Sequence, residues 1–109
     1  MAELDIGALM KQAQALQEKL KSAQEQAAAQ VVDADAGGGM VRVSVDGSMQ
    51  VRRIEIDPSL IASNDKGMLE DLIVVAINQG LKKASEMVAQ EMSKLGPLGG
   101  LKLPGFGID

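Results

Sequence analysis

The fold is decided by residues 68–77, Met-Leu-Glu-Asp-Leu-Ile-Val-Val-Ala-Ile. At helical spacing this stretch carries two apolar stripes at different angles around the helix axis. The first stripe runs on through the helix as Leu69, Ile73, Ala76, Ile77, Leu81, Ala84 and Val88. The second stripe is shorter and consists of Met68, Leu72 and Val75, after which the same spacing gives Gln79, Lys82 and Glu86. We therefore expect a sheet to cover the first stripe and a second copy of the chain to cover the second.

Composition sets the size and excludes several classes of function. A chain of 109 residues with a net charge of −4 favours one domain with a modest core, and a single aromatic residue, Phe106, favours burial shared between subunits. The sequence has no Cys and no His, which excludes disulfides, thiolate or imidazole metal sites and imidazole-dependent triads. It also lacks a Gly-rich phosphate loop, so we expect neither an enzyme nor a bound cofactor.

Two features of the sequence bear on localisation. Glu3 and Asp5 stand where a secretion signal carries positive charge, and the longest apolar run, residues 72–77, is far below the roughly 20 residues of a membrane span. We expect a cytoplasmic protein with no membrane association.

The first third of the chain predicts one long helix, from about Ile6 to Gln30 with Asp5 as N-cap. Its apolar residues alternate three and four apart as in a heptad seam, at Ile6, Leu9, Ala13, Leu16, Leu20, Ala23 and Ala27. A helix of this length exceeds the width of a small domain, so part of it protrudes or pairs with another long helix. An ordinary bundle helix is the alternative.

Three strands follow. Residues 31–36 alternate and lead into Gly37-Gly38-Gly39, which predicts an edge strand and a turn, and the carboxylates of Asp33 and Asp35 are expected to be solvated rather than to bind a metal. Residues 40–45 place three valines on one face, and Asp46-Gly47 predicts a tight hairpin with positive φ at both residues. In the returning strand the apolar residues change phase at Arg52-Arg53, which predicts a bulge there.

The rest of the chain predicts a short turn or helix after Asp57-Pro58 and a second long helix from about Lys66 to Met92 or Lys94, capped by Asn64 or Asp65 and stopped by Gly96-Pro97. The predicted class is α+β: a long helix, a three-stranded antiparallel sheet and a second long helix. Residues 1–95 form one domain, and residues 96–109 form a Gly/Pro-rich flexible tail.

Four segments resemble the YbaB/EbfC family of bacterial nucleoid-associated proteins: residues 38–47, 51–60, 65–78 and 103–106, the last being Leu-Pro-Gly-Phe. The resemblance implies a homodimer shaped like tweezers, whose sheets and second helices form the body and whose first helices project as arms that contact DNA. Gly67 stands where the family pattern has Glu, a difference that affects the start of the helix.

Basic residues that could contact phosphates fall into three sets. On the first helix they are Lys11, Lys19 and Lys21, of which Lys21 has Glu18 and Glu25 at a spacing that favours neutralisation. On the sheet they are Arg42, Arg52 and Arg53, expected together on the outer face, and on the last helix Lys82 and Lys83, with Lys94 beyond Glu86. Solvated faces that keep the protein soluble are the alternative interpretation of each.

Two functions from different classes follow. The first is a nucleoid-associated homodimer that binds duplex DNA with little sequence preference, affecting DNA conformation, nucleoid organisation and gene expression; the absence of an aromatic platform disfavours single strands. Its dimer interface is expected at Met68, Leu72 and Val75. The second is a protein-interaction adaptor for recombination or DNA repair machinery, which the net negative charge favours.

Overall fold

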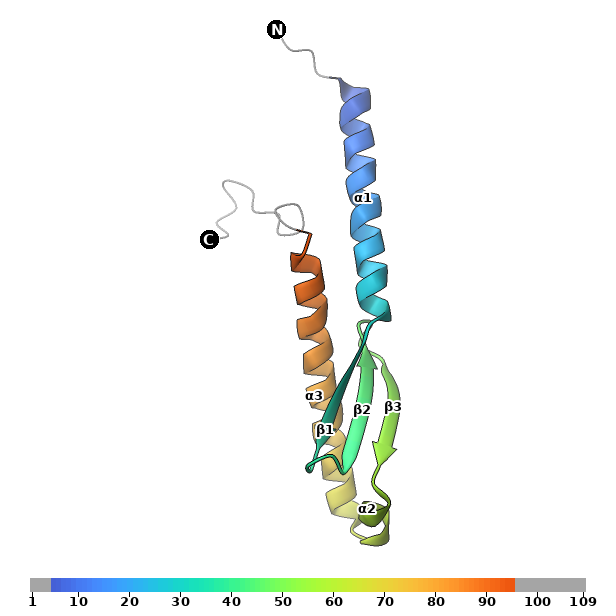
Figure 1. Ribbon diagram of the computed structural model, residues 1–109, viewed down its shortest axis with the longest axis vertical. Helices are drawn as coiled ribbons and strands as arrows, with labels where there is room; N and C mark the ends of the chain where they lie inside the picture. The colour runs from blue at the N-terminus through green and yellow to red at the C-terminus, as the bar shows by residue number, and fades with distance from the viewer. Residues whose placement is uncertain (1–4, 96–109) are drawn as a thin grey trace, which may run out of the picture.

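A computed structural model describes residues 5–95 and shows a small sheet with one long helix packed along it and a second long helix, antiparallel to the first, extending beyond the sheet (Figure 1). The elements in chain order are α1 (Ile6–Ala29), β1 (Val31–Ala36), β2 (Val41–Asp46), β3 (Val51–Ile56), α2 (Pro58–Ala62) and α3 (Lys66–Ser93). The predicted α+β order and the element boundaries are confirmed within one or two residues.

The caps that the sequence predicts begin both long helices. Asp5 accepts a hydrogen bond from the backbone N–H of Ala8 at 3.1 Å, and Asp65 accepts one from Met68 at 3.0 Å. Such caps satisfy backbone donors that have no partner inside the helix. The short α2 begins in the same way, with the carboxylate of Asp57 accepting from the N–H and hydroxyl of Ser59.

The sheet has the order β1-β2-β3, with both pairs antiparallel. The three glycines between β1 and β2 all have positive φ, between 63° and 95°, as the predicted turn requires. Ser44 pairs with Arg53 and Val45 pairs with Val51, which leaves Arg52 as the extra residue and confirms the predicted bulge. Apolar residues before and after the bulge therefore stay on one face of β3.

The hairpin between β2 and β3 differs from the predicted one. Positive φ occurs at Met49 (φ 65°), and Asp46 and Gly47 do not have it. The Asp46 carbonyl accepts from Met49 N at 3.0 Å, and Asp46 N donates to the Gln50 carbonyl at 2.9 Å, so the loop is longer than a two-residue turn. The prediction was wrong because Asp46 is recruited into a buried hydrogen-bond network instead of the turn.

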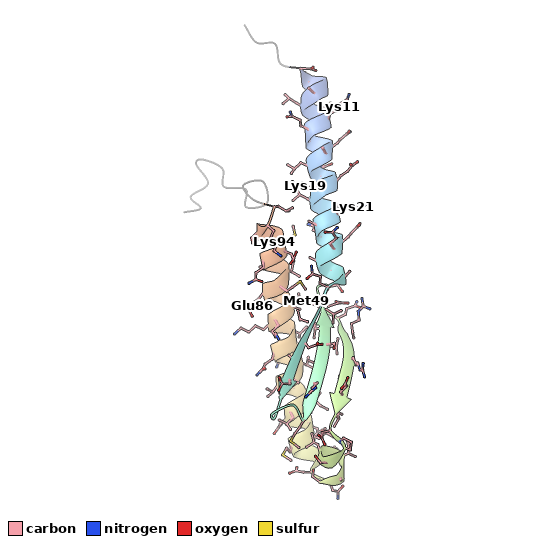
Figure 2. All side chains as sticks on the ribbon, in the orientation of Figure 1. Lys11, Lys19, Lys21, Met49, Glu86 and Lys94 are labelled. Carbon is pink, nitrogen blue, oxygen red and sulfur yellow. The ribbon has the colours of Figure 1, made fainter. Side chains whose placement is uncertain are left out.

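Gly47 is required for a different reason, its contact with the end of α1. A Cβ added to it would lie 1.9 Å from the Ala27 carbonyl oxygen. The Gly47 N–H donates to the Gln30 carbonyl at 3.0 Å, and Gln30 is the single residue between α1 and β1. The tip of the hairpin is thus fixed against the junction of α1 and β1, near the labelled Met49 in Figure 2.

The core lies between α3 and the first two strands. Val41, Val43 and Val45 are at most 1% exposed, and Ala76 and Ala84 of α3 are fully buried against this cluster. Gly80 allows the closest approach, because a Cβ there would lie 2.6 Å from a Val45 methyl. The first apolar stripe of α3 is confirmed as the core-facing one.

Two groups of apolar side chains stay uncovered. On α3, Met68 and Val75 of the second stripe are 39% and 44% exposed, whereas Leu72 is half-buried and packs against the core of its own chain. On the inner face of β3, which α3 does not cover, Val51 and Ile54 are 39% and 43% exposed. Within one chain Met68 and Val75 are thus uncovered, whereas Leu72 is partly covered, and the prediction that a second copy covers all three stays a prediction.

Candidate nucleic-acid interface

The eight predicted DNA-contacting cations do not form one patch. The structure distributes them over α1, the sheet and α3, along a body whose longest dimension is 78 Å (Figure 2). Each set has a different electrostatic environment, which decides how much positive charge it presents to a ligand.

The three lysines of α1 are exposed and point to different sides of the helix. At about 100° per residue, Lys19 is rotated by about 80° from Lys11, and Lys21 by about 200° from Lys19. The predicted neutralisation of Lys21 by Glu18 and Glu25 is not seen, since within residues 5–95 no ion pair shorter than 4.0 Å joins them. The side chains extend into solvent instead, as expected for surface ion pairs that gain little.

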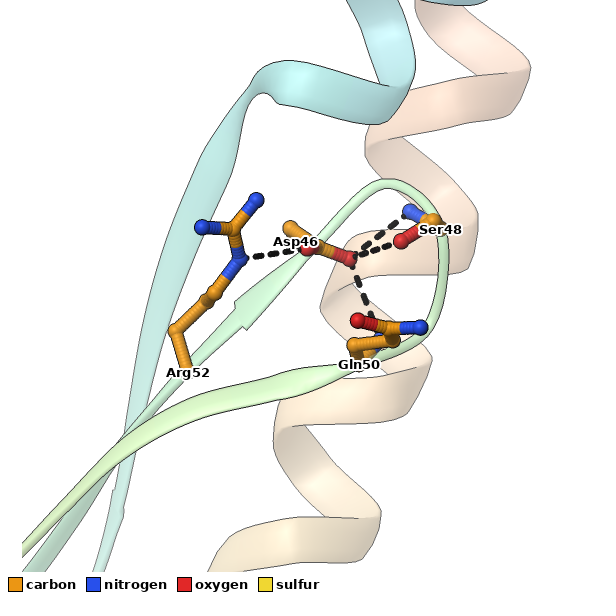
Figure 3. Close-up of polar contacts among 4 residues, drawn as sticks. All are labelled: Asp46, Ser48, Gln50 and Arg52. Carbon is orange, nitrogen blue, oxygen red and sulfur yellow. Dashed lines mark hydrogen bonds and ion pairs between the residues drawn. The ribbon is translucent and has the colours of Figure 1, made fainter.

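Arg52 forms an ion pair with a buried carboxylate, that of Asp46. Its Nε lies 2.6 Å from Oδ2 of Asp46, which is 1% exposed, and Figure 3 shows the same carboxylate accepting from Ser48 and Gln50. The hydrogen bond from the Ser48 hydroxyl, followed by that from Arg52, lowers the pKa of Asp46 well below its ordinary value of about 3.9. The charge of Arg52 is therefore largely balanced within the protein.

Arg42 and Arg53 are brought together on the outer face of the sheet, as predicted, but without Arg52. They line a hollow of about 480 Å³, together with Asp33, Asp35 and Glu55. Arg53 pairs with Glu55 at 2.8 Å, and the register places Arg42 between Asp35 and Glu55. Two arginines lie beside three carboxylates there, so the net charge of this face is negative and does not favour an anion.

The carboxylates of β1, Asp33 and Asp35, are both exposed. Asp33 accepts a hydrogen bond from the Ser44 hydroxyl at 2.6 Å across the strand pair. Within residues 5–95, no group of three or more acidic side chains is arranged to hold a metal ion.

Lys82 and Lys83 lie on α3, beyond the point where the second stripe becomes polar. Both are exposed, and Lys83 Nζ donates to the Asp33 carbonyl at 2.5 Å, a bond that leaves its charge unbalanced. Lys94, which follows the last residue of α3, pairs with Glu91 at 3.0 Å and lowers the pKa of that carboxyl. The two adjacent lysines are thus the cations of the second half of α3 that no carboxylate pairs with in the part of the chain that the structure describes.

Charge is unevenly distributed along the long axis. At the end formed by α2 and the first turns of α3, four carboxylates (Asp57, Asp65, Glu70 and Asp71) face one lysine, Lys66. Towards the opposite end, α1 and its cap Asp5 carry three lysines and three carboxylates, and α3 from residue 82 carries two lysines and two glutamates before Lys94. The end with the long arm is therefore the more positive one, which net charge alone conceals.

The uncovered apolar side chains form the other candidate surface. Sequence patterns identified Met68 and Val75 but missed Val51, Ile54 and Val74, of which Val74 is 57% exposed. The strand residues alternate as core residues do, and only the placement of α3 over β1 and β2 shows that they lack a cover. No signal in the sequence indicates that placement.

Fold and surface together define a small α+β protein with its charged groups on open faces and a long helix extending from a helix-backed sheet (Figure 1). Residues 1–101 match the YbaB/EbfC DNA-binding family, and the chain belongs to this family. The family resemblance of the sequence motifs is thereby confirmed.

Relatives and a solved structure agree with this assignment. A nucleoid-associated protein of Syntrophobacter fumaroxidans is 48% identical over 99 residues, covering 91% of this chain and 88% of the relative. One from Thermoanaerobacter pseudethanolicus is 44% identical over 102 residues, covering 94% and 90%. The crystal structure of the uncharacterized protein HP0035 of Helicobacter pylori has the same fold, with a TM-score of 0.69, 24% identity and coverage of 85% of this chain and 98% of that one. In the part of the chain that the structure describes, no helix is long and apolar enough to cross a membrane.

Proposed function

We propose that the protein is a nucleoid-associated protein that binds duplex DNA as a homodimer with little sequence specificity. Family membership over residues 1–101 carries the proposal, and relatives named as nucleoid-associated support it. DNA as the partner would place the protein at the nucleoid, in the cytoplasm, where it would affect DNA conformation and gene expression.

The homodimer is supported by the uncovered apolar side chains. Met68, Val74 and Val75 of α3 and Val51 and Ile54 of β3 are each at least 39% exposed in a single chain. Burying them against a second copy would stabilise the pair by the hydrophobic effect, at roughly 25 cal/mol for each Å² of apolar surface removed from water. The proposed interface therefore keeps Met68, Leu72 and Val75 and adds the inner face of β3.

The DNA-contacting end is proposed from the charge distribution. Phosphates are repelled by the four carboxylates around α2 and attracted by the lysines of the opposite half. Lys82 continues the spacing of the second stripe beyond Val75, and Lys83 is its neighbour, so twofold symmetry would add the lysines of the second subunit to those of the first. Lys19 and Lys21 would extend the contact along α1, whereas Arg52 and Arg53 are already paired with carboxylates.

Little sequence specificity follows from the chemistry of these contacts. Lysine ammonium groups on separate elements bind phosphates, which are the same in every sequence, and specificity requires hydrogen bonds to base edges. The sequence offers one aromatic residue, Phe106, so stacking on single-stranded bases is not expected to contribute.

A salt titration tests this function. Affinity for a labelled 30-base-pair duplex, measured by fluorescence anisotropy between 50 and 200 mM salt, should fall linearly on a double-logarithmic plot, by a slope of about 0.9 per phosphate contacted. Two duplexes of unrelated sequence and equal length should give the same line. Affinity that does not change with salt, or no binding at 50 mM, would contradict the proposal.

A second function has one observation in its favour. The acidic end around α2 also exposes Ile61, at 56%, so a protein partner with a basic, partly apolar surface would fit it. This adaptor would serve recombination or repair proteins. Retention of a protein partner by a dimer that binds no duplex at low salt would favour it over DNA binding.

A further inference from the structure

The apolar stripe of α1 is covered along only part of its length. Ala27 at its C-terminal end is 1% exposed, whereas Leu9 and Ile6 at the other end are 49% and 68% exposed. An open hollow along this face is lined by Leu9, Gln12, Ala13, Ala15, Leu16 and Lys19. The exposed half carries the larger side chains of the stripe, and it is the half without a cover.

The cover of the other half is α3, which ends too early to reach the hollow. The two helices contact each other, and Figure 1 shows that they lie side by side along the C-terminal part of α1. The described chain ends at Leu95, beside the C-terminal half of α1 (Figure 1). The first half of α1 extends beyond that point.

An uncovered helix segment of this kind needs a partner. Its exposed apolar stripe carries an unfavourable hydration cost, which a partner that buries the stripe would remove. The chain that follows α3 begins at the edge of the covered region and has 14 residues, 96–109, outside the described part. This segment is long enough to continue the cover from the end of α3.

We propose that residues 96–109 bind in the hollow of α1 of the same chain and continue the cover that α3 begins. The apolar residues of this segment are Leu98, Leu101, Leu103, Phe106 and Ile108, with prolines at 97 and 104. The stripe from Leu20 to Ile6 is about 21 Å long at 1.5 Å per residue, and the first 11 residues of the segment span up to about 36 Å when extended. Lys102 and Asp109 leave the segment without net side-chain charge, so no repulsion opposes docking. This proposal requires neither DNA binding nor dimerisation.

The absence of cysteine from the sequence makes a direct test possible. A nitroxide label on Gln17→Cys, an exposed position outside the hollow, should selectively broaden the NMR signals of Leu101, Leu103 and Phe106. The paired substitution Leu103→Ser/Phe106→Ser should remove the broadening, and Lys102→Ser should not.

Hydrogen exchange provides a second measurement on the full chain. Ending the chain after Leu95, or the paired tail substitution, should accelerate exchange of the amides of residues 10–18 by roughly tenfold and leave those of β2 unchanged. Docking within a chain is distinguished from docking between chains by a mixed sample. In this sample one copy carries the nitroxide and no ¹⁵N, and the other carries ¹⁵N and no nitroxide, so any broadening arises between copies. The proposal is overturned if the tail signals are not broadened, if broadening occurs only between copies, or if α1 of a second copy is broadened instead.

Discussion

The guanidinium of Arg52 lies 2.6 Å from a carboxylate, Asp46, that is almost completely buried, although Arg52 itself is 59% exposed. The bulge produces this relationship, because the extra residue in β3 changes the alternation of side chains at Arg52. A residue that the sequence presents as a DNA contact thus stabilises the hairpin that supports α1. Removing a partner of a buried charge leaves that charge uncompensated, which is strongly destabilising.

Acid should destabilise the protein partly through Asp46. Its pKa is lowered in the folded state, so its contribution to the free energy of unfolding is complete above the ordinary pKa of about 3.9 and is lost as the pH falls below that value. Urea denaturation at pH 7 and pH 3 should show Asp46→Asn strongly destabilised at pH 7 and closer to wild type at pH 3. The control is Asp71→Asn, an exposed carboxylate; equal pH dependence of both variants would contradict the role of Asp46.

Gly47→Ala should destabilise the fold by at least about 2 kcal/mol, because its Cβ would lie 1.9 Å from the backbone oxygen of Ala27 and neither backbone can move freely. The matched control is Gly38→Ala. Gly38 has φ +65° but no atom within 4 Å of an added Cβ, so the strain of a left-handed alanine, about 1 kcal/mol, is its expected cost. Thermal unfolding measures both, and similar losses in the two variants would refute the clash.

Met49→Gly should stabilise the protein by about 0.5–1 kcal/mol. Met49 is held at φ 65°, a conformation that costs a residue with a Cβ about 1–2 kcal/mol. Glycine removes this strain, but its larger conformational entropy in the unfolded state offsets part of the stabilisation. Its side chain is 40% exposed, so little packing is lost. Chemical denaturation compares the two proteins, and a less stable variant would show that the methionine packs more than its exposure indicates.

Val74→Asp/Val75→Asp should dissociate the proposed dimer and leave the subunit folded, because both side chains are at least 44% exposed in a single chain. This pair is a cleaner test than Leu72, which packs in its own core. Sedimentation equilibrium gives the mass and circular dichroism the fold. Ser85→Asp, exposed further along α3, is the control, and a dimer that survives the double substitution places the interface elsewhere.

Lys82→Gln/Lys83→Gln should weaken duplex binding equally for all sequences and reduce the slope of affinity against salt by about 0.9 for each phosphate that the variant no longer binds. Lys66→Gln, at the acidic end, removes positive charge of the same kind and should have little effect. Fluorescence anisotropy over the same salt range measures all three proteins. An equal decrease in affinity per charge removed would indicate that only net charge matters.

Local sequence signals predicted most of the fold. The heptad spacing, the caps Asp5 and Asp65 and the glycine turn act within a few residues, so α1, α3 and the strand order follow from them. The phase change at Arg52-Arg53 even located the bulge. The hairpin was wrong because the backbone at Asp46 responds to a buried network that involves Ser48, Gln50 and Arg52.

Long-range placement explains what sequence could not predict about the candidate surfaces. Lys82 and Lys83 were identified as cations, but their availability depends on which strand lies beside α3. The uncovered inner face of β3 and the role of Gly80 depend on how α3 crosses the sheet. That crossing brings together residues far apart in the sequence, such as Gly80 and Val45. The uneven charge along the molecule likewise requires the antiparallel arrangement of the two long helices.

The junction at Gln30 has a mechanical consequence. One residue joins α1 to the sheet, and the hairpin tip is hydrogen-bonded to it, so the projecting helix has no hinge at its base. In the proposed homodimer, two such helices would enclose a gap of fixed width. The protein would then select its ligand by thickness, accepting a cylinder that fits the gap and resisting one that forces it wider.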